Sequence, residues 1–459
     1  MNRTARTSTI IAAAAASSML VAPLITALAT PLPGPVGIPE AHAQSSSSSS
    51  LDAPWFGSMS SALGRTLSSA GPASSSGSST GGSELSSTTL KTDQPLPQEP
   101  GRLVAREKVG SSHNERILYT STNERGDIVP VSGAIYPARG TGGMDSNGGT
   151  TNGRKGTVVL APGTRGMGDQ CAPSAASSML VRVDGSSANV NYEAPIAQRL
   201  ADEGYQVVVT DYIGLGTPGV HTYLNRIDQG HAVIDAARAT TSPNEKVFFY
   251  GYSQGGGATA AAGELQPDYA PELNLVGIFA GAPPANPETM LTQGNPVTLE
   301  PVTAMVIASY AYSYPEFRAA LGEHTTAKAN RYLAAVAASC LAETTGSSAP
   351  LERLAPGAPS LSELVVSDPR ITRTLRLNRL GTVPVRAPIL IAQSPQDNVV
   401  PYAQGQQLAS DYRDLGSPVT FLSIPLADAT SRAGLGHVAP AITHSGEVIR
   451  WMNERFADS

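Results

Sequence analysis

The sequence predicts an α/β fold: a mostly parallel sheet with helices on both faces and an inserted helical cap. Two observations predict this fold. Short apolar runs alternate with segments of helical spacing through most of the chain, which is typical of strands buried on both faces of a sheet. The stretch at about 285–385 interrupts this alternation, because it has helical spacing and no clear core strand.

The expected elements follow one another in a regular order. A β-hairpin comes first, with strands Ile117–Thr120 and Val129–Tyr136. Further strands are expected at Thr157–Leu160, Gln206–Thr210, Lys246–Tyr250, Leu275–Ala280, Pro388–Ala392 and Val419–Ile424. Helices are expected at Tyr192–Glu203, Ile227–Arg238, Ala258–Leu265 and Ser445–Phe456. The strands are short and rich in β-branched or aromatic residues, which favours strand over helix.

Two further helices are expected inside the insertion, at Val302–Tyr314 and Ala327–Leu341. We interpret this insertion as a cap that covers the sheet. The alternative is a peripheral helical lobe with no part in binding.

The N-terminal residues 1–43 are typical of an export signal. Arg3 and Arg6 precede a mostly apolar run from Ile10 to Ala29, and Ala41 and Ala43 provide the small residues that a signal peptidase needs. We expect secretion after cleavage near Ala43, with or without association with the cell envelope. An uncleaved anchor helix is the alternative, because the apolar run is about long enough to span a bilayer.

Composition separates the rest of the chain into a linker and a folded body. Residues 44–95 are rich in Ser and Gly and have too little apolar surface to offset ordering entropy, which predicts a disordered linker. Residues 96–459 are expected to form the folded α/β domain, with the helical insertion at about 285–385. The net charge of −6 offers no basic surface for nucleic acid, and no stable protein partner is implied.

The chain has two cysteines, Cys171 and Cys340. In an exported chain an even number of cysteines favours a disulfide, because the compartment is oxidising. Two buried free thiols are the alternative. The bridge would close a loop of about 170 residues, for which chain entropy gives at most roughly 5 kcal/mol.

The strongest functional signal is the pentapeptide Gly251–Gly255, with Ser253 at its centre, between an expected strand and an Ala/Gly-rich segment of helical spacing. A serine hydroxyl must be presented beside a base to act as a nucleophile. A tight strand-to-helix turn presents it, and small residues on either side relieve the clash that the turn creates. This context predicts a nucleophile elbow and an α/β-hydrolase fold.

The acid and the base of such a site follow the serine in that order. Asp397 lies in a loop just after an expected strand, and Asp428 is the second choice for the acid. His437 is expected in a loop after the strand that ends at Ile424, whereas His444 lies on or beside the closing helix. We therefore predict that His437 is the base and that Asp397 orients it.

The oxyanion of an ester-cleaving site needs two backbone donors. One is expected to be the amide of Gln254, and the other the amide of Thr164, with Arg165 and Gly166 as neighbouring candidates. Metal-binding motifs and phosphate-binding loops are absent from the sequence, so neither a metal nor another cofactor is implied.

Several segments together resemble the secretory lipase family. They are Gly163–Ser174, Asp211–Gly216 and Gly251–Gly256. The resemblance extends over about residues 96–459. The segment Cys171-Ala172-Pro173-Ser174 makes it more specific than the serine motif alone.

The resemblance implies an α/β-hydrolase with a helical cap, a bridge between Cys171 and Cys340, and a triad of Ser253, Asp397 and His437. One departure concerns the oxyanion loop, where yeast members of the family carry a carboxylate in the place of Thr164. The expected activity is hydrolysis of carboxylic esters, chiefly triacylglycerols, through an acyl-enzyme on Ser253, with action at a lipid–water interface. Hydrolysis of soluble short-chain esters, acyl transfer to a lipid or sugar alcohol, and a non-catalytic surface protein are the alternatives.

Overall fold

The computed structural model describes residues 95–110, 112, 114–139, 142–144, 150–176, 181–184, 187–293, 296–344, 357–426 and 434–458. The predicted export signal and nearly all of the predicted linker lie outside the described residues, as does Asp428. Both of those predictions and the domain boundaries therefore remain predictions.

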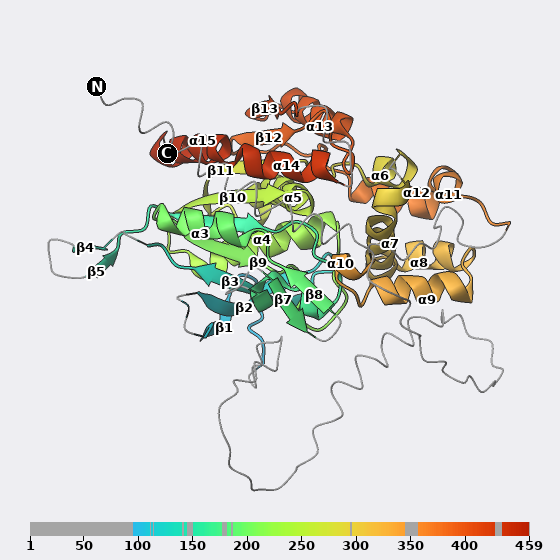
Figure 1. Cartoon of the computed structure of the whole chain (residues 1–459), viewed down its shortest axis with the longest axis horizontal. Coiled ribbons are helices and arrows are strands. Elements are labelled where there is room, and N and C mark those ends of the chain that lie inside the picture. The colour runs from blue at the N-terminus through green and yellow to red at the C-terminus, as the bar shows by residue number, and fades with distance from the viewer. Residues whose placement is uncertain are drawn as a thin grey trace, which may run out of the picture.

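A nine-stranded sheet forms the centre of the protein (Figure 1), with the strand order β1-β2-β3-β9-β6-β10-β11-β12-β13. The strands are β1 (Leu103–Lys108), β2 (Glu115–Thr122), β3 (Ile128–Tyr136), β6 (Thr157–Ala161), β9 (Gln206–Thr210), β10 (Lys246–Tyr252), β11 (Asn274–Gly281), β12 (Ile389–Gln393) and β13 (Val419–Ser423). Neighbouring strands pair in parallel along the part β9-β6-β10-β11-β12-β13 of this order. Along the part β1-β2-β3-β9, neighbouring strands pair antiparallel. The predicted mostly parallel sheet is confirmed.

The burial of each strand explains which strands could be predicted. Every residue of β6, β9 and β12 is buried, in agreement with their mostly apolar sequences, which are polar only at their ends. The edge strand β1 was not predicted, because its sequence Leu-Val-Ala-Arg-Glu-Lys has no clear apolar alternation and its side chains are exposed or half-buried.

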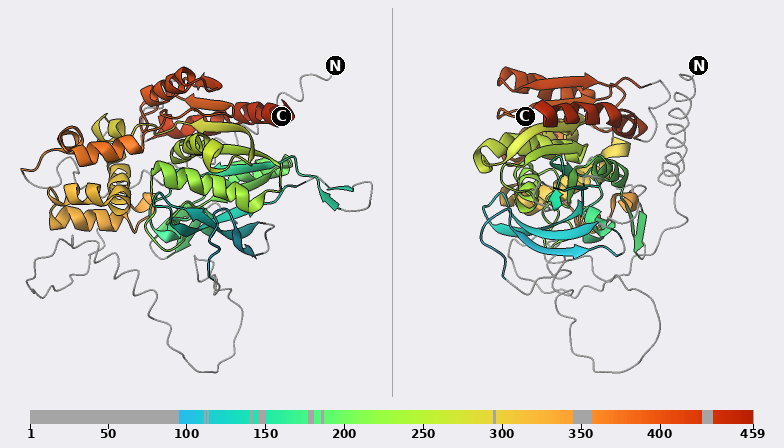
Figure 2. Two further views of the ribbon diagram at one scale, coloured as in Figure 1. Left: turned by 180° about the vertical axis from the view of Figure 1, so that it is seen from behind. Right: turned by 90° about the vertical axis from the view of Figure 1, so that its left-hand side faces the viewer.

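Helices cover both faces of the sheet, as predicted (Figure 2). One face packs against α4 (Arg226–Thr240), α5 (Gln254–Tyr269) and α13 (Tyr402–Asp414) through a common apolar core. The other face packs against α3 (Ala194–Asp202) and α15 (Ser445–Asp458) through a second core. The short helix α14 (Leu435–Thr443) leads into α15. Two hairpins, β4–β5 (Gly142–Met144, Thr150–Asn152) and β7–β8 (Val181–Asp184, Ser187–Val190), lie outside the main sheet.

The regular elements in the described part of the chain between β11 and β12 are all helices, and they lie beside the sheet (Figure 1). Its helices are α6 (Pro287–Gln293), α7 (Pro296–Ser313), α8 (Pro315–Gly322), α9 (Ala327–Val336), α10 (Leu341–Thr344), α11 (Leu361–Ser367) and α12 (Pro369–Leu377). We call these seven helices the cap. The sequence prediction of one helix over Ala327–Leu341 is wrong, because α9 ends at Val336 and the following residues turn toward the sheet domain.

The cap has its own apolar core, which extends into loops of the sheet domain. Met167, Val220, Tyr223 and Leu224 belong to the same buried cluster as the helices of the cap. Tyr314, directly after α7, also accepts hydrogen bonds from the side chains of Asn225 and Asn378. Among the helices in the described ranges, none combines the length and the hydropathy needed to cross a membrane.

The predicted disulfide between Cys171 and Cys340 is confirmed, and it joins the 3-10 turn Asp169–Cys171 to the start of α10. The two cysteines are 169 residues apart, and their Cα atoms are 5.4 Å apart. Both side chains are buried, together with Ala172 and Leu215.

A variant with both Cys171→Ser and Cys340→Ser should lose up to about 5 kcal/mol of unfolding free energy, because its unfolded chain is no longer cross-linked. Urea unfolding of the oxidised protein and of the variant measures this loss. Thiol labelling of the unfolded, unreduced wild-type protein should detect no free cysteine. Two labelled thiols per chain would contradict the bridge.

A buried carboxyl group lies in the first turn of α4. The side chain of Asn225 caps this helix by accepting from the amides of Ile227 and Asp228. Asp228 Oδ1 accepts from the amide of Glu124 at 2.6 Å, and the side chain of Asp228 is buried. Burial, reinforced by the negative charge of Glu124, raises the pKa of Asp228 from 3.8 to about 7.

Because this pKa is raised in the folded chain, the stabilisation that protonation of Asp228 provides is lost as the pH rises toward 7. Asp228→Asn retains an acceptor and stays neutral. The variant should therefore gain stability relative to the wild type between pH 5 and pH 8, by an amount on the order of 2 kcal/mol, since one pKa unit corresponds to about 1.4 kcal/mol. Denaturant unfolding at both pH values tests this, with the exposed Asp414→Asn as control. An equal difference at the two pH values would contradict it.

Candidate active site

Ser253 lies in the tight turn between β10 and α5, as the sequence predicted for a nucleophile elbow. Its backbone has φ 59° and ψ −123°, a strained conformation for a residue with a side chain. The amide of Ser253 donates to the carbonyl of Gly281 at 2.8 Å, and the carbonyl of Ser253 accepts from Gly257 at 3.1 Å. These bonds hold the strained residue between β11 and the first turn of α5.

The glycines of the elbow allow backbone segments to approach one another closely. A Cβ atom at Gly251 would lie 2.1 Å from the carbonyl oxygen of Gly255. A Cβ atom at Gly255 would lie 1.9 Å from the carbonyl oxygen of Ala161, at the end of β6. Both contacts are too short for a side chain, so this turn requires glycine at both positions.

The structure brings Ser253, His437 and Asp397 together from three distant parts of the chain. His437 Nε2 lies 2.8 Å from Ser253 Oγ, and His437 Nδ1 lies 2.8 Å from Asp397 Oδ2. The side chain of Asp397 is fully buried and that of His437 is 7% exposed. The chain of hydroxyl, imidazole and carboxylate has the geometry that nucleophilic attack by serine requires.

The structure places His437 and His444 on either side of the question that the sequence left open, which of the two is the base: only His437 contacts Ser253 and Asp397. His437 was expected in a loop, but it lies in the first turn of α14, which begins at Leu435. The apolar sequence Leu-Gly-His-Val-Ala-Pro does not mark a helix, and a proline interrupts it. His444 follows α14 and its Nδ1 contacts the hydroxyl of Thr443, so it points to a surface residue and not to Asp397.

Backbone and side-chain donors hold Asp397 and His437 in place. Asp397 Oδ1 accepts from the amides of Val399 and Val400, each at 2.9 Å. The hydroxyl of Tyr252, the residue before Ser253, donates to the carbonyl of His437 at 2.6 Å. Burial and the charge of Asp397 raise the pKa of Tyr252 well above 10, which keeps this donor protonated.

Two predicted oxyanion donors lie on adjacent segments. Gln254 is the first residue of α5, where amides have no partner within the helix. Thr164 follows β6; its hydroxyl lies 2.7 Å from the hydroxyl of Tyr223, and its carbonyl accepts from Tyr192 at 2.9 Å. Within the described part of the chain, the amides of Gln254, Thr164 and Arg165 have no hydrogen-bond acceptor. They are therefore available to a ligand.

His221 is a neighbour of the site that the sequence analysis did not identify. Its Nε2 lies 3.0 Å from the side-chain amide of Gln254, and its Nδ1 lies 3.2 Å from the carbonyl of Ile213. Burial lowers the pKa of His221 to about 4, so the ring is neutral at pH 7 and accepts from Gln254. No motif in the sequence marks this contact, because it joins a loop to the first turn of α5, 33 residues further along the chain.

One group of side chains among the described residues has the composition of a metal site. Donor atoms of Glu323, His324 and Asp368 lie within 4.8 Å of one another. The guanidinium of Arg370 already pairs with both carboxylates, at 2.7 and 2.6 Å. The charges of both carboxylates are thus already balanced by a cationic side chain.

Comparisons with known proteins agree with the fold and the motifs. The sequence model of the family described as Secretory lipase matches residues 179–459. The chain is 26% identical over 300 residues to the Secreted triacylglycerol lipase LIP3 of Malassezia restricta. This alignment covers 63% of this chain and 62% of the relative. It is also 26% identical over 299 residues to a protein of Mycobacterium tuberculosis named a probable inactive lipase, covering 63% and 64% of the two chains. The chain thus spans less than two thirds of the length of these relatives.

Two solved structures show the same fold at low sequence identity. The closed state of Candida antarctica lipase A has a TM-score of 0.63 and 19% identity, covering 78% of this chain and 83% of that one. A rice cell wall degrading esterase from Xanthomonas oryzae has a TM-score of 0.59 and 18% identity, covering 78% and 100%. The fold is therefore that of the α/β-hydrolases. Because the family model matches more than half of the sequence, the chain belongs to the secretory lipase family.

Proposed function

We propose that the protein is a secreted serine hydrolase that cleaves carboxylic esters of lipids, with triacylglycerols as the main substrate class. The observation that carries this proposal is the continuous contact from Ser253 Oγ through His437 to Asp397, with 2.8 Å at each step. One relative is named a probable inactive lipase, so family membership alone does not establish activity. The complete set of three side chains supports an active enzyme here.

In the proposed mechanism, Ser253 Oγ attacks the ester carbonyl while His437 Nε2 takes its proton. Asp397 holds the imidazole in the required tautomer. The amides of Gln254 and Thr164 stabilise the oxyanion, a contribution of roughly 3 kcal/mol for each donor. The tetrahedral intermediate collapses as His437 returns the proton to the leaving alcohol, and an acyl group remains on Ser253. Water activated by His437 then releases the fatty acid.

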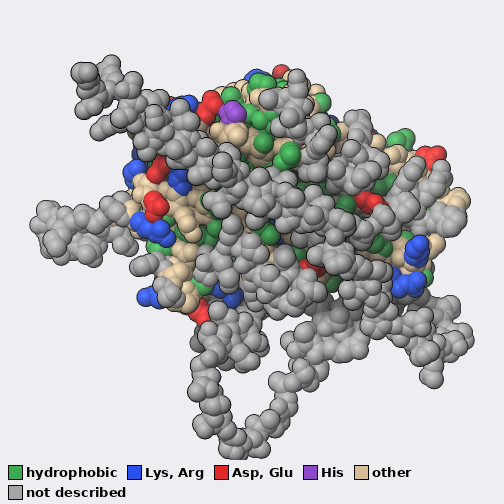
Figure 3. All heavy atoms as spheres, in the orientation of Figure 1, with side chains coloured by type: hydrophobic (Ala, Val, Ile, Leu, Met, Phe, Trp, Pro, Cys, Tyr) green, Lys and Arg blue, Asp and Glu red, His purple; other side chains and the backbone are tan. Residues whose placement is uncertain are grey.

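Exposed apolar side chains near the site favour the proposal that the substrate is a lipid in an emulsion or another aggregate. Val438 and Ile442, on the helix that carries His437, are each 43% exposed. Hydrophobic side chains reach the surface in the upper part of the molecule in Figure 3, where α13 and α14 lie in Figure 1. No charged residue occurs in α14, whereas helices at the surface usually present a polar face to water. Apolar surface of this kind is typical of contact with lipid.

The cap offers a second surface of this kind. Val366 and Leu377 are 77% and 54% exposed and line a hollow of about 480 Å³ on α11 and α12, together with Arg373 and Arg376. Apolar and cationic side chains side by side favour an interface that carries released fatty acid anions.

Export of the chain is inferred from three observations. Residues 1–43 have the sequence pattern of a signal peptide. The Cys171–Cys340 bridge suits an oxidising compartment. Relatives from Malassezia are named secreted lipases.

Ser253→Ala should abolish hydrolysis of a soluble nitrophenyl ester, with a loss of at least about 1,000-fold in kcat, because no other group replaces the nucleophile. Initial rates measure the loss. A fluorophosphonate probe should label the wild type and leave the variant unlabelled. Ser445→Ala, at the half-buried start of α15, is the matched control and should behave as the wild type. Equal rates in the wild type and Ser253→Ala would sink the assignment.

The wild type should hydrolyse an emulsified long-chain triglyceride faster than a soluble short-chain ester, because the apolar surfaces favour adsorption to lipid. Titration of released acid measures both rates with the same enzyme preparation. Activity on the soluble ester alone would identify a short-chain carboxylesterase. Formation of a new ester when alcohols are added would identify an acyltransferase.

A further inference from the structure

The loop that follows β6 is held by a pair of residues before α3. We call Gly163–Met167 the oxyanion loop, because it contains the proposed donor Thr164. Glu193 Oε1 accepts from the amide of Gly163 at 2.7 Å, and Glu193 Oε2 pairs with the guanidinium of Arg165. The hydroxyl of Tyr192 donates to the carbonyl of Thr164 at 2.9 Å. Three consecutive residues of the oxyanion loop thus contact two consecutive residues outside it.

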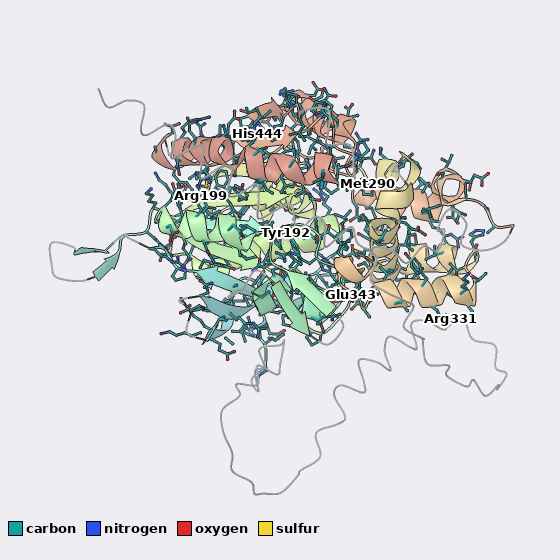
Figure 4. The ribbon with its side chains drawn as sticks, viewed as in Figure 1. Tyr192, Arg199, Met290, Arg331, Glu343 and His444 are labelled. Atoms are coloured by element: carbon teal, nitrogen blue, oxygen red, sulfur yellow. A yellow bond between two sulfur atoms is a disulfide. The ribbon has the colours of Figure 1, made fainter. Side chains whose placement is uncertain are left out.

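The ion pair in this arrangement is buried. The side chains of Arg165 and Glu193 are only 3% and 12% exposed. The guanidinium also donates to Asn191 Oδ1 at 3.0 Å and to the carbonyl of Val190. It lies over the ring of Tyr192, with 4.2 Å from Arg165 Cζ to the ring centroid. Tyr192 is labelled in Figure 4.

Burying two charges adds little net stability compared with an apolar pair of similar volume, so stability alone does not explain this arrangement. Its geometric effect is specific. Glu193 accepts the hydrogen bond of the Gly163 amide. Among the described residues, the next two amides, of Thr164 and Arg165, have no acceptor. The carboxylate thereby determines which amides of the loop stay available.

The cap holds the other side of the oxyanion loop. The carbonyl of Arg165 accepts from the amide of Leu341 at 2.7 Å, and the amide of Met167 donates to the carbonyl of Ser339 at 3.0 Å. Cys340, between these two cap residues, forms the disulfide with Cys171. The loop therefore lies between a covalently anchored segment of the cap and the carboxylate of Glu193.

We propose that Glu193, paired with Arg165, is a positioning residue that holds the amide of Thr164 in place for the oxyanion of the ester bound at Ser253. This inference rests on the proposed ester hydrolysis. It concerns the transition state and not the binding of the substrate. Loss of the pair should therefore lower kcat and spare KM, because the donor is needed most when negative charge develops on the carbonyl oxygen.

Two variants test this role. Glu193→Gln keeps an acceptor for the amide of Gly163 but leaves the buried guanidinium without its counter-charge. Tyr192→Phe removes only the hydroxyl that binds the carbonyl of Thr164, and Tyr192 is 45% exposed, so this variant should fold even if the first does not. Glu245→Gln is the matched control. It disrupts the partly buried Arg154–Glu245 pair, with side chains 19% and 12% exposed, at the opposite end of β10 from Ser253.

The measurements are kcat and KM for a soluble ester, the inhibition constant of an alkyl boronic acid that mimics the tetrahedral intermediate, and the melting temperature. Glu193→Gln should lower kcat about 10- to 100-fold, as expected for a displaced donor, and weaken boronate inhibition by a similar factor. Tyr192→Phe should lower both in the same direction by a smaller factor. Glu245→Gln should lower only the melting temperature.

Unchanged kcat and boronate inhibition in both Tyr192→Phe and folded Glu193→Gln would overturn the positioning role. A change confined to KM, or an equal loss of kcat in Glu245→Gln, would also overturn it. Failure of the proposed function itself would look different, because the wild type would then neither hydrolyse the ester nor bind the boronate.

Discussion

The close backbone packing around Ser253 is the constraint on which the rest of the site depends. The backbone of Ser253 is strained. This conformation persists because the amide of Ser253 donates a hydrogen bond to the carbonyl of Gly281 and because Gly255 lies against the carbonyl of Ala161. These contacts join β6, β10 and β11 to the first turn of α5. They place the hydroxyl at the carboxyl edge of the sheet and leave the amide of Gln254 without a helical partner.

Ser253, Asp397 and His437 come together at this edge from three separate segments, namely the turn before α5, the loop after β12 and the first turn of α14. Asp397 follows β12, and two backbone amides hold its free oxygen, so only one oxygen faces the imidazole. Tyr252 connects the strand that carries the nucleophile to the backbone of His437. Because the donor groups are fixed by the scaffold, little reorganisation is needed when charge develops during the reaction.

The cap and the oxyanion loop are joined by apolar packing, backbone hydrogen bonds and the disulfide. The buried cluster of the cap includes Met167 and Tyr223 of the sheet domain. The segment around Cys340 pairs with the loop, and the disulfide prevents it from separating. On the opposite side, Glu193 and Tyr192 complete the support. The position of one proposed donor thus depends on three regions that are distant in the sequence.

The sequence alone determined the parallel strands and pointed to Ser253 as the proposed nucleophile. Fully buried strands such as Gln206–Thr210 have an apolar centre, here three consecutive valines, and the elbow requires glycine on both sides of Ser253, so both features are visible as local patterns. The order of acid and base along the chain also led to Asp397 and His437. Only the tertiary structure decided where α9 ends, that His437 lies in a helical turn, and that Glu193 and His221 contact the site. Those features arise from hydrogen bonds between distant segments, and such contacts leave no periodicity or motif in the residues that make them.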